Sequence, residues 1–117
     1  LRNEPITVFG NGNQTRCFTY VEDVARGVLT VYEKGKKGEA YNIGNNQPTT
    51  ILELAQLIKE LAKSKSEIIK AGFGKDTRLK EREIEYRIPD ISKMKALGWQ
   101  PKTMIREGIN KILSMKN

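Results

Sequence analysis

The chain has 117 residues, which is enough for one domain with a modest core and excludes two full domains. Its hydrophobic fraction of 38% and charged fraction of 30% are typical of a soluble globular chain, and no apolar run approaches the roughly 18 residues needed to span a membrane. The net charge of +7 favours anionic ligands, a single cysteine excludes an internal disulfide, and the lack of histidine disfavours a zinc site.

The N-terminal sequence, residues 1–5, has neither an initiator methionine nor the layout of a signal peptide. We therefore expect the numbering to begin inside a longer natural chain, and the lone Cys17 fits a reducing, cytoplasmic setting. The lysines are scattered and do not form one stripe interleaved with aromatic residues, which disfavours nucleic acid as the anion. A nucleoside diphosphate is a smaller anion that one or two arginines can neutralise.

The first part of the chain predicts short extended segments followed by a helix. Residues 5–9 alternate polar and apolar side chains and end at a Gly-Asn-Gly-Asn turn, and residues 15–21 show the same alternation. The two segments are joined by a glycine-rich loop, with Arg16 just beyond it. Apolar residues then recur at three- and four-residue spacing over 24–32, which predicts a helix that ends in the glycine and lysine run at 34–38.

The middle of the chain contains the strongest helix signal. The apolar run at residues 40–43 predicts a strand followed by a loop. Thr50 and Glu53 have capping-box spacing at the start of an amphipathic helix that runs toward Lys63. A further short strand is expected at 67–70.

The last part of the chain predicts a loop and two helices. Residues 72–87 are polar and lack a period, and loops of this length are often functional. Asp90 can cap a short helix that ends at Gly98, and an amphipathic helix follows over 104–113. Short strands with about four helices predict a mixed α/β (α+β) fold, with residues 1–117 as a single domain.

Three stretches of the sequence have a distinctive order and spacing. They are VFGNGNQTRCFTYVEDVA at residues 8–25, AYNIG through TILELA at 40–55, and PDISK through LGWQP at 89–101. Together they resemble the C-terminal half of extended short-chain dehydrogenases/reductases that act on nucleotide sugars. This group includes UDP-glucose 4-epimerase, UDP-glucuronate decarboxylase and dTDP-glucose 4,6-dehydratase, and the resemblance covers nearly the whole chain.

The resemblance implies that the chain is the small C-terminal, substrate-binding lobe of a Rossmann-type enzyme whose NAD-binding domain precedes it. The intact parent would bind NAD and a UDP-sugar, oxidise a sugar hydroxyl transiently and return the hydride. A UDP-glucose 4-epimerase is the leading expectation, and a UDP-glucuronate decarboxylase or dTDP-glucose 4,6-dehydratase is the alternative. The sequence has no Gly-x-x-Gly-x-x-Gly stretch, and its one Tyr-x-x-x-Lys spacing, Tyr32 to Lys36, falls at a helix end. We therefore expect no catalytic residue and no bound NAD in this chain, and whether the chain alone is an enzyme stays open.

Arg16 is the first candidate for a ligand contact. In the family, the arginine at this position reaches the substrate diphosphate and the residues just before it, here Gln14 and Thr15, border the nucleotide. A guanidinium offers paired donors matched to phosphate oxygens and keeps its charge. Without the resemblance, a solvated surface arginine is the simpler interpretation.

A second ligand contact is expected in the charged loop. The family's pattern of an arginine followed three residues later by an acidic residue falls on Lys80 and Glu83. The resemblance implies a phosphate contact for Lys80 and a ribose hydrogen bond for Glu83. Because lysine departs from the pattern, Arg82 or Arg78 can replace it, and a solvated charged loop is the alternative interpretation.

Two other classes of function remain open. The chain could be a non-enzymatic basic module that binds nucleic acid or acidic partners. It could instead be a structural fragment without ligand affinity. In relatives, the resemblance implies that the helix from Val24 and the strand at Tyr41 face the missing domain. An exposed apolar patch is then expected, and with it homodimerisation or incomplete order.

Overall fold

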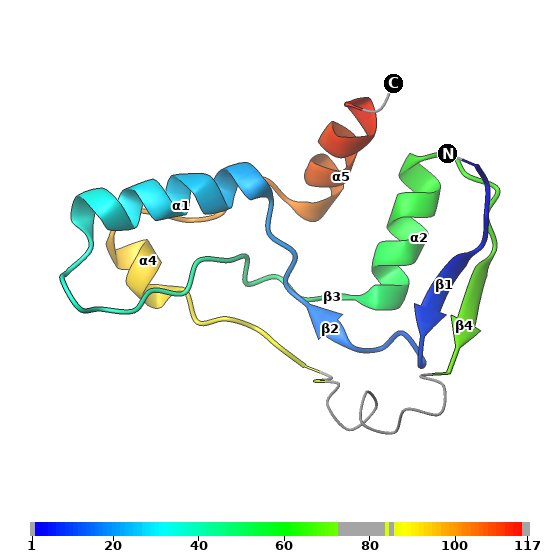
Figure 1. Ribbon diagram of the computed structural model, residues 1–117, viewed down its shortest axis with the longest axis horizontal. Helices are drawn as coiled ribbons and strands as arrows, with labels where there is room; N and C mark the ends of the chain where they lie inside the picture. The colour runs from blue at the N-terminus through cyan, green and yellow to red at the C-terminus, as the bar shows by residue number, and fades with distance from the viewer. Residues whose placement is uncertain (1, 73–83, 85, 116–117) are drawn as a thin grey trace.

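The computed structural model describes residues 2–72, 84 and 86–115 of the chain. Short strands alternate with helices along its length, and the described part contains four helices, which confirms the predicted mixed α/β class (Figure 1). The elements in chain order are β1 (Ile6–Phe9), β2 (Thr15–Arg16), α1 (Val21–Lys34), β3 (Thr49–Thr50), α2 (Ile51–Leu61), β4 (Ile68–Ala71), α4 (Ser92–Ala96) and α5 (Ile105–Ser114).

One end of the molecule is a two-stranded parallel sheet covered by α2. Strands β1 and β4 pair from Ile6 with Ile68 to Phe9 with Ala71, and α2 supplies the crossover between them. Val8 of β1 is only 2% exposed. The strands expected at 5–9 and 67–70 are therefore present.

A second pair of strands, β2 and β3, is shorter than the first. Strand β2 pairs with β3 in antiparallel fashion, with Arg16 opposite Thr49. Strand β2 is shorter than the extended segment predicted for 15–21, since it ends at Arg16 and α1 begins at Val21.

The prediction of a strand at residues 40–43 is wrong. Within the described residues no strand pairs with this segment, and its side chains pack against a neighbouring cluster instead. Tyr41 and Ile43 contact that cluster, and the Asn42 side chain donates to the Asp90 carbonyl at 3.1 Å. An apolar run forms a strand only where a partner strand is available.

That cluster is the main hydrophobic core beside α1. Its buried members are Ile91, Met94 and Trp99, which are 4%, 0% and 1% exposed. Gly27 of α1 allows the close approach, since a β-carbon there would lie 2.6 Å from Ile43 Cγ2 and 3.2 Å from Trp99 Nε1. The pairing of α1 with the segment around α4 therefore depends on a glycine in the middle of the helix.

The predicted starts of the helices that follow α1 are confirmed. Thr50 Oγ1 accepts from the Glu53 amide at 3.1 Å, and Glu53 Oε2 accepts from the Thr50 amide at 2.8 Å. The carboxylate of Asp90 accepts from the Ser92 amide at 2.9 Å, where α4 begins. Helix α5 matches the segment expected at 104–113.

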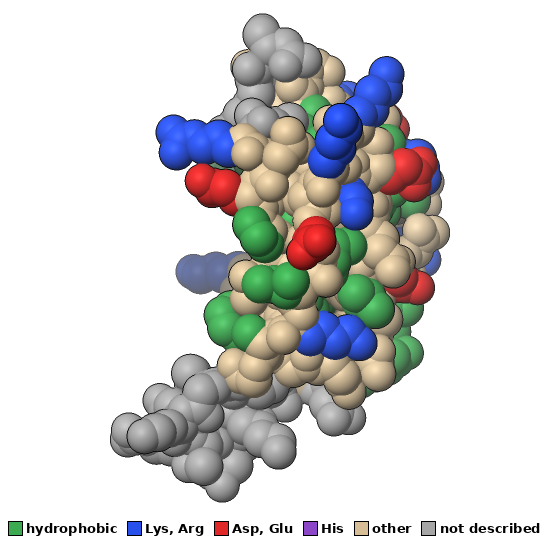
Figure 2. Space-filling model, turned by 90° about the vertical axis from the view of Figure 1, so that its right-hand side faces the viewer, with side chains coloured by type: hydrophobic (Ala, Val, Ile, Leu, Met, Phe, Trp, Pro, Cys, Tyr) green, Lys and Arg blue, Asp and Glu red, His purple; other side chains and the backbone are tan. Residues whose placement is uncertain are grey.

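The molecule is flat, with extents of 47 × 39 × 17 Å. On the face drawn in Figure 2, the described lysine and arginine side chains are interspersed with acidic and apolar ones and form no continuous basic stripe. Within the described residues, every helix is too short or too polar to cross a membrane.

Candidate functional site

Arg16 lies in β2, where two backbone carbonyls hold its side chain. Its Nη1 donates to the carbonyl of Thr15 at 2.7 Å and to the carbonyl of Ile84 at 2.6 Å. The second contact joins residues that are 68 positions apart in the sequence. The guanidinium is therefore held beside the backbone of residue 84.

The loop before Arg16 is hydrogen-bonded to the start of α2. The carbonyls of Gly12 and Gln14 accept from the amides of Leu52 and Ile51 at 3.0 and 3.1 Å. These amides belong to the first turn of α2, which has no partners for them within the helix. The same loop therefore caps α2 and determines where β2 begins.

The two other residues predicted to border the nucleotide have structural partners. Gln14 is 9% exposed, and its Nε2 donates to the Phe9 carbonyl at 3.3 Å. Thr15 pairs with Thr50 in the β2–β3 ladder. Their contact with a nucleotide stays a prediction.

The second predicted group, Lys80, Arg82 and Glu83, lies outside the described residues. The residue that follows this group, Ile84, carries the carbonyl that binds Arg16. Arg16 and the end of the charged loop, which are distant in the sequence, are therefore neighbours in space.

The Cys17 side chain provides the next contact between the same two segments. Its thiol is half-buried and donates to the Arg87 carbonyl at 3.6 Å. Burial raises the pKa of Cys17, which favours the neutral thiol over the nucleophilic thiolate. This cysteine therefore joins two segments and is poorly suited to covalent chemistry.

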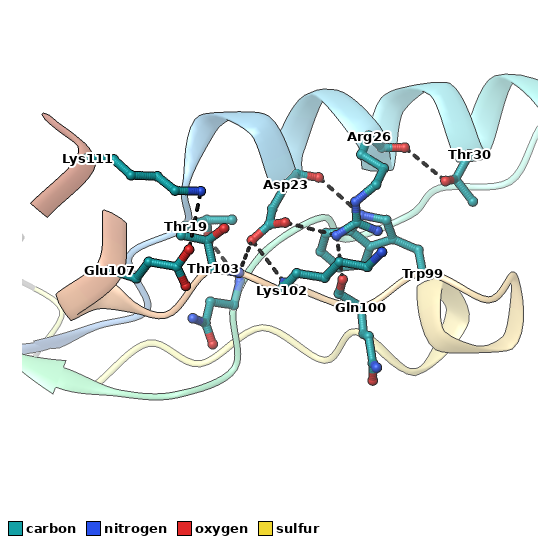
Figure 3. A network of polar contacts seen from close by, with 11 residues as sticks. Thr19, Asp23, Arg26, Thr30, Trp99, Gln100, Lys102, Thr103, Glu107 and Lys111 are labelled. Atoms are coloured by element: carbon teal, nitrogen blue, oxygen red, sulfur yellow. Dashed lines mark hydrogen bonds and ion pairs between the residues drawn. The ribbon is translucent and has the colours of Figure 1, made fainter. Parts of the chain in front are cut away.

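A buried carboxylate anchors the turn that follows β2. Asp23 in the first turn of α1 is 3% exposed and accepts from Arg26 Nη2 and from the amides of Lys102 and Thr103 (Figure 3). Trp99 Nε1 donates to the Asp23 carbonyl at 3.1 Å. This network ties the start of α1 to the segment before α5.

An apolar groove of about 280 Å³ lies between α2, α5 and residues 18–20. Its walls include Leu54 and Ile58 from α2 and Ile109 and Ile112 from α5. The predicted ligand residues that the structure describes, Arg16, Gln14 and Thr15, do not line it, and apolar walls do not suit a diphosphate. The groove and the Arg16 region are therefore distinct features.

The fold matches solved enzymes that act on nucleotide sugars. UDP-glucose 4-epimerase from Thermotoga maritima, solved with UDP-glucose, is 33% identical with a TM-score of 0.85, over 97% of this chain and 35% of that one. dTDP-glucose 4,6-dehydratase from Bacillus anthracis, solved with NAD, is 26% identical with a TM-score of 0.83, again over 97% and 35%. These neighbours define the class as NAD-dependent nucleotide-sugar epimerases and dehydratases, which confirms the predicted resemblance.

The chain belongs to the GDP-mannose 4,6-dehydratase family, whose model matches residues 1–112. Among the curated relatives, UDP-glucuronic acid decarboxylase 1 from Danio rerio is 40% identical over 114 residues, which are 97% of this chain and 26% of that protein. UDP-glucuronic acid decarboxylase 6 from Arabidopsis thaliana is 42% identical over 110 residues, covering 93% and 30%. The chain thus spans about a quarter of the length of the first of these relatives. They support the decarboxylase alternative over the leading 4-epimerase expectation.

NAD is bound by solved members of the family, including the B. anthracis dehydratase. The present sequence contains no Gly-x-x-Gly-x-x-Gly stretch, the motif that brings a helix N-terminus close to the dinucleotide pyrophosphate. That this chain alone binds no NAD stays a prediction, and no chemical step through NAD is assigned to its residues.

Proposed function

We propose that this chain is the nucleotide-sugar-binding portion of an NAD-dependent enzyme of the UDP-glucuronic acid decarboxylase type. The decarboxylase relatives support the substrate class, and the position of Arg16 supports the ligand contact. The observation that carries the proposal is the hydrogen bond from Arg16 to the Ile84 carbonyl, which brings the predicted phosphate contact to the end of the charged loop.

The physical basis of the proposed diphosphate contact is the guanidinium of Arg16, whose orientation is fixed before the ligand binds. A guanidinium keeps its charge and presents its donors in one plane, which matches pairs of phosphate oxygens. The two carbonyl contacts restrict the side-chain rotamers of Arg16. Less conformational entropy is then lost on binding than for a mobile surface arginine.

In this proposal the chain binds and orients the nucleotide and performs no bond-breaking step. Arg16 contacts the diphosphate, and Gln14 and Thr15 border the nucleotide beside it. The whole protein would supply NAD, which takes and returns a hydride, together with the catalytic tyrosine and lysine. Residues 1–117 would form the substrate-binding domain of that protein.

Titration calorimetry with UDP tests the Arg16 assignment. We expect Arg16→Ala to weaken UDP binding roughly tenfold or more, because it removes charged hydrogen bonds to phosphate. The loss should shrink as salt rises, since screening weakens the interaction. The control is Arg106→Ala, which removes an exposed ion pair with Glu60 on α2.

Equal UDP affinity of Arg16→Ala and the wild type would contradict the proposal. A random oligonucleotide that binds the wild type more tightly than UDP does, with strong salt dependence, would favour the basic binding module instead.

A further inference from the structure

The side chain of Thr19 holds the backbone that leaves β2. Its hydroxyl donates to the Cys17 carbonyl at 3.3 Å and accepts from the Asn45 amide at 2.9 Å. A threonine hydroxyl has one donor and two acceptor positions, so these two bonds use the donor and one of the acceptors. The second bond joins residues 26 positions apart in the sequence. Thr19 thus links the backbone just after Arg16 to the segment that leads into β3.

The turn on the other side of this link is itself held in shape. Asn45 is 3% exposed, and its Oδ1 accepts from the Gln47 amide at 2.9 Å. An asparagine that bonds to the backbone two residues later fixes a local turn. Gly44 lies directly before it, where a β-carbon would be 3.5 Å from Thr19 Oγ1 and 3.4 Å from Pro89 Cγ. The partner of Thr19 is therefore a buried and closely packed turn.

Two separate contacts determine how the backbone at Arg16 lies relative to β3. At Arg16 itself, strand pairing places the residue opposite Thr49. Three residues later, the Thr19 hydroxyl bonds to Asn45. Strands β2 and β3 have only two residues each, which is short for a ladder, so their pairing alone defines the strand direction poorly. The Thr19 bond supplies a second point, and two points define the direction of the backbone that carries the Arg16 side chain.

We propose that Thr19 is a positioning residue for the diphosphate contact of Arg16. This inference rests on the proposed function, because Arg16 is the group that contacts the ligand. The Thr19 hydroxyl bonds to Cys17 and Asn45, and it acts on the ligand only through the backbone of residues 16–19. A contact residue whose backbone is already held in its binding orientation loses less conformational entropy when the ligand binds.

The test is calorimetric titration of Thr19→Val, Thr19→Ser and a matched control with UDP. Valine keeps the branched shape of threonine but neither donates nor accepts, whereas serine keeps the hydroxyl. The control is Thr30→Val, which removes a hydroxyl that donates to the Arg26 carbonyl at 2.8 Å within α1. We expect Thr19→Val to weaken UDP binding roughly fivefold, the equivalent of one lost hydrogen bond. Thr19→Ser and Thr30→Val should stay within about twofold of the wild type.

A double-mutant cycle with Arg16→Ala separates positioning from a general loss of structure. If Thr19 acts through Arg16, Thr19→Val should cause no further loss of UDP affinity once the Arg16 side chain is removed. A substitution that only loosened the fold would lower the affinity by the same factor in both backgrounds. Circular dichroism shows before titration whether each variant is folded. If Thr19→Val is unfolded, Asn45→Ala takes its place, because it removes the Oδ1 acceptor that holds the same turn.

The possible results separate this inference from the proposed function. If Arg16→Ala loses UDP affinity while Thr19→Val matches Thr30→Val, the positioning role is refuted and the proposed function stands. Equal losses in Thr19→Val and Thr19→Ser also refute it, since the hydroxyl is then not the cause. If Arg16→Ala binds UDP as tightly as the wild type, both are overturned. A loss that serine restores, and that disappears in the Arg16→Ala background, supports both.

Discussion

Asp23 is the buried charge on which the start of α1 depends. Burial by itself raises the pKa of this carboxyl, but hydrogen bonds from the Thr103 amide, the Arg26 guanidinium and the Lys102 amide together bring the pKa below its usual value. The carboxylate thus has donors on both oxygens (Figure 3). A buried acceptor with this many donors is costly to replace.

We expect Asp23→Asn to lower the free energy of unfolding by about 2 kcal/mol at neutral pH, because one oxygen becomes a donor that faces other donors. Since the folded-state pKa is lowered, the stabilisation is present above the unfolded pKa of about 4 and is lost as the pH falls through the folded-state value. Urea unfolding of both proteins between pH 7 and pH 3 measures the difference.

The difference between the wild type and Asp23→Asn should therefore narrow below about pH 4. Asp90→Asn serves as the control, because that carboxylate is exposed at the start of α4 and its removal should cost less. A difference that stays constant down to pH 3 would show that the charge of Asp23 contributes nothing.

At this scale the sequence predicts local partners better than distant ones. The pairing of Asp23 with Arg26, for example, joins residues only three positions apart on one helix. The contacts of Arg16 with Ile84 and of Cys17 with Arg87 span 68 and 70 positions. No periodicity or spacing in the sequence encodes such a contact.

At the scale of elements, the loop between β1 and β2 decides how α2 and Arg16 are placed. Gly12 lies at its centre with φ of +76°, and a β-carbon there would be 2.9 Å from Val8 Cγ1 and 3.0 Å from Leu52 Cβ. Gly38, in the turn after α1, has a similar φ of +80° but has no atom near its β-carbon position among the described contacts. A comparison of alanine substitutions at the two glycines therefore distinguishes the cost of a positive φ, present at both, from the cost of steric overlap, present only at Gly12.

We expect Gly38→Ala to cost about 1 kcal/mol, the penalty for an L-residue in the left-handed region. Gly12→Ala should cost at least about 1 kcal/mol more, because the new methyl group overpacks the contact between β1 and α2. Denaturant unfolding of the two variants measures both values. Equal losses of unfolding free energy in the two variants would show that the loop between β1 and β2 accommodates the new methyl group without a packing penalty.

The elements themselves were predictable to the extent that their signals are local. The capping box of Thr50 and Glu53 lies within one turn, and it marks the start of α2 correctly. The run at 40–43 has strand-like composition, but whether it pairs depends on the rest of the fold. Tyr41 and Ile43 pack on the cluster beside α1, which satisfies their apolar surface without a ladder.

At the scale of the whole molecule, the chain is more open than a typical globular domain of its size. Its radius of gyration is 17.0 Å. A compact chain of this length is expected at about 13 Å. The described residues also leave large apolar side chains exposed, and four of these lie along α1. The described residues thus leave part of their apolar surface uncovered.

The outer face of α1 carries a group of exposed apolar side chains. Val21, Val28, Leu29 and Tyr32 are 70%, 56%, 61% and 87% exposed, and they recur at helical spacing. This is the apolar surface expected from the family resemblance. The other expected part, around Tyr41, packs into the chain's own cluster instead.

We expect two copies of the chain to associate through this α1 face in antiparallel orientation. Such pairing buries both apolar stripes and sets the acidic first turn of one helix, with Glu22, beside the basic end of the other, with Lys34. Sedimentation velocity over a range of concentrations measures the association. Val28→Glu should weaken it at least roughly tenfold, because it buries a charge in the apolar stripe.

Ile69→Glu places the same change on β4, where Ile69 is 42% exposed, and should leave the association unchanged. If both variants dissociate equally, the contact is a general consequence of apolar exposure and not of α1. If the wild-type chain is monomeric at every concentration, the α1 stripe does not pair with itself. In that case the remaining portion of a longer enzyme subunit is the partner to test on the α1 face, because relatives of this family extend well beyond the region that the chain matches.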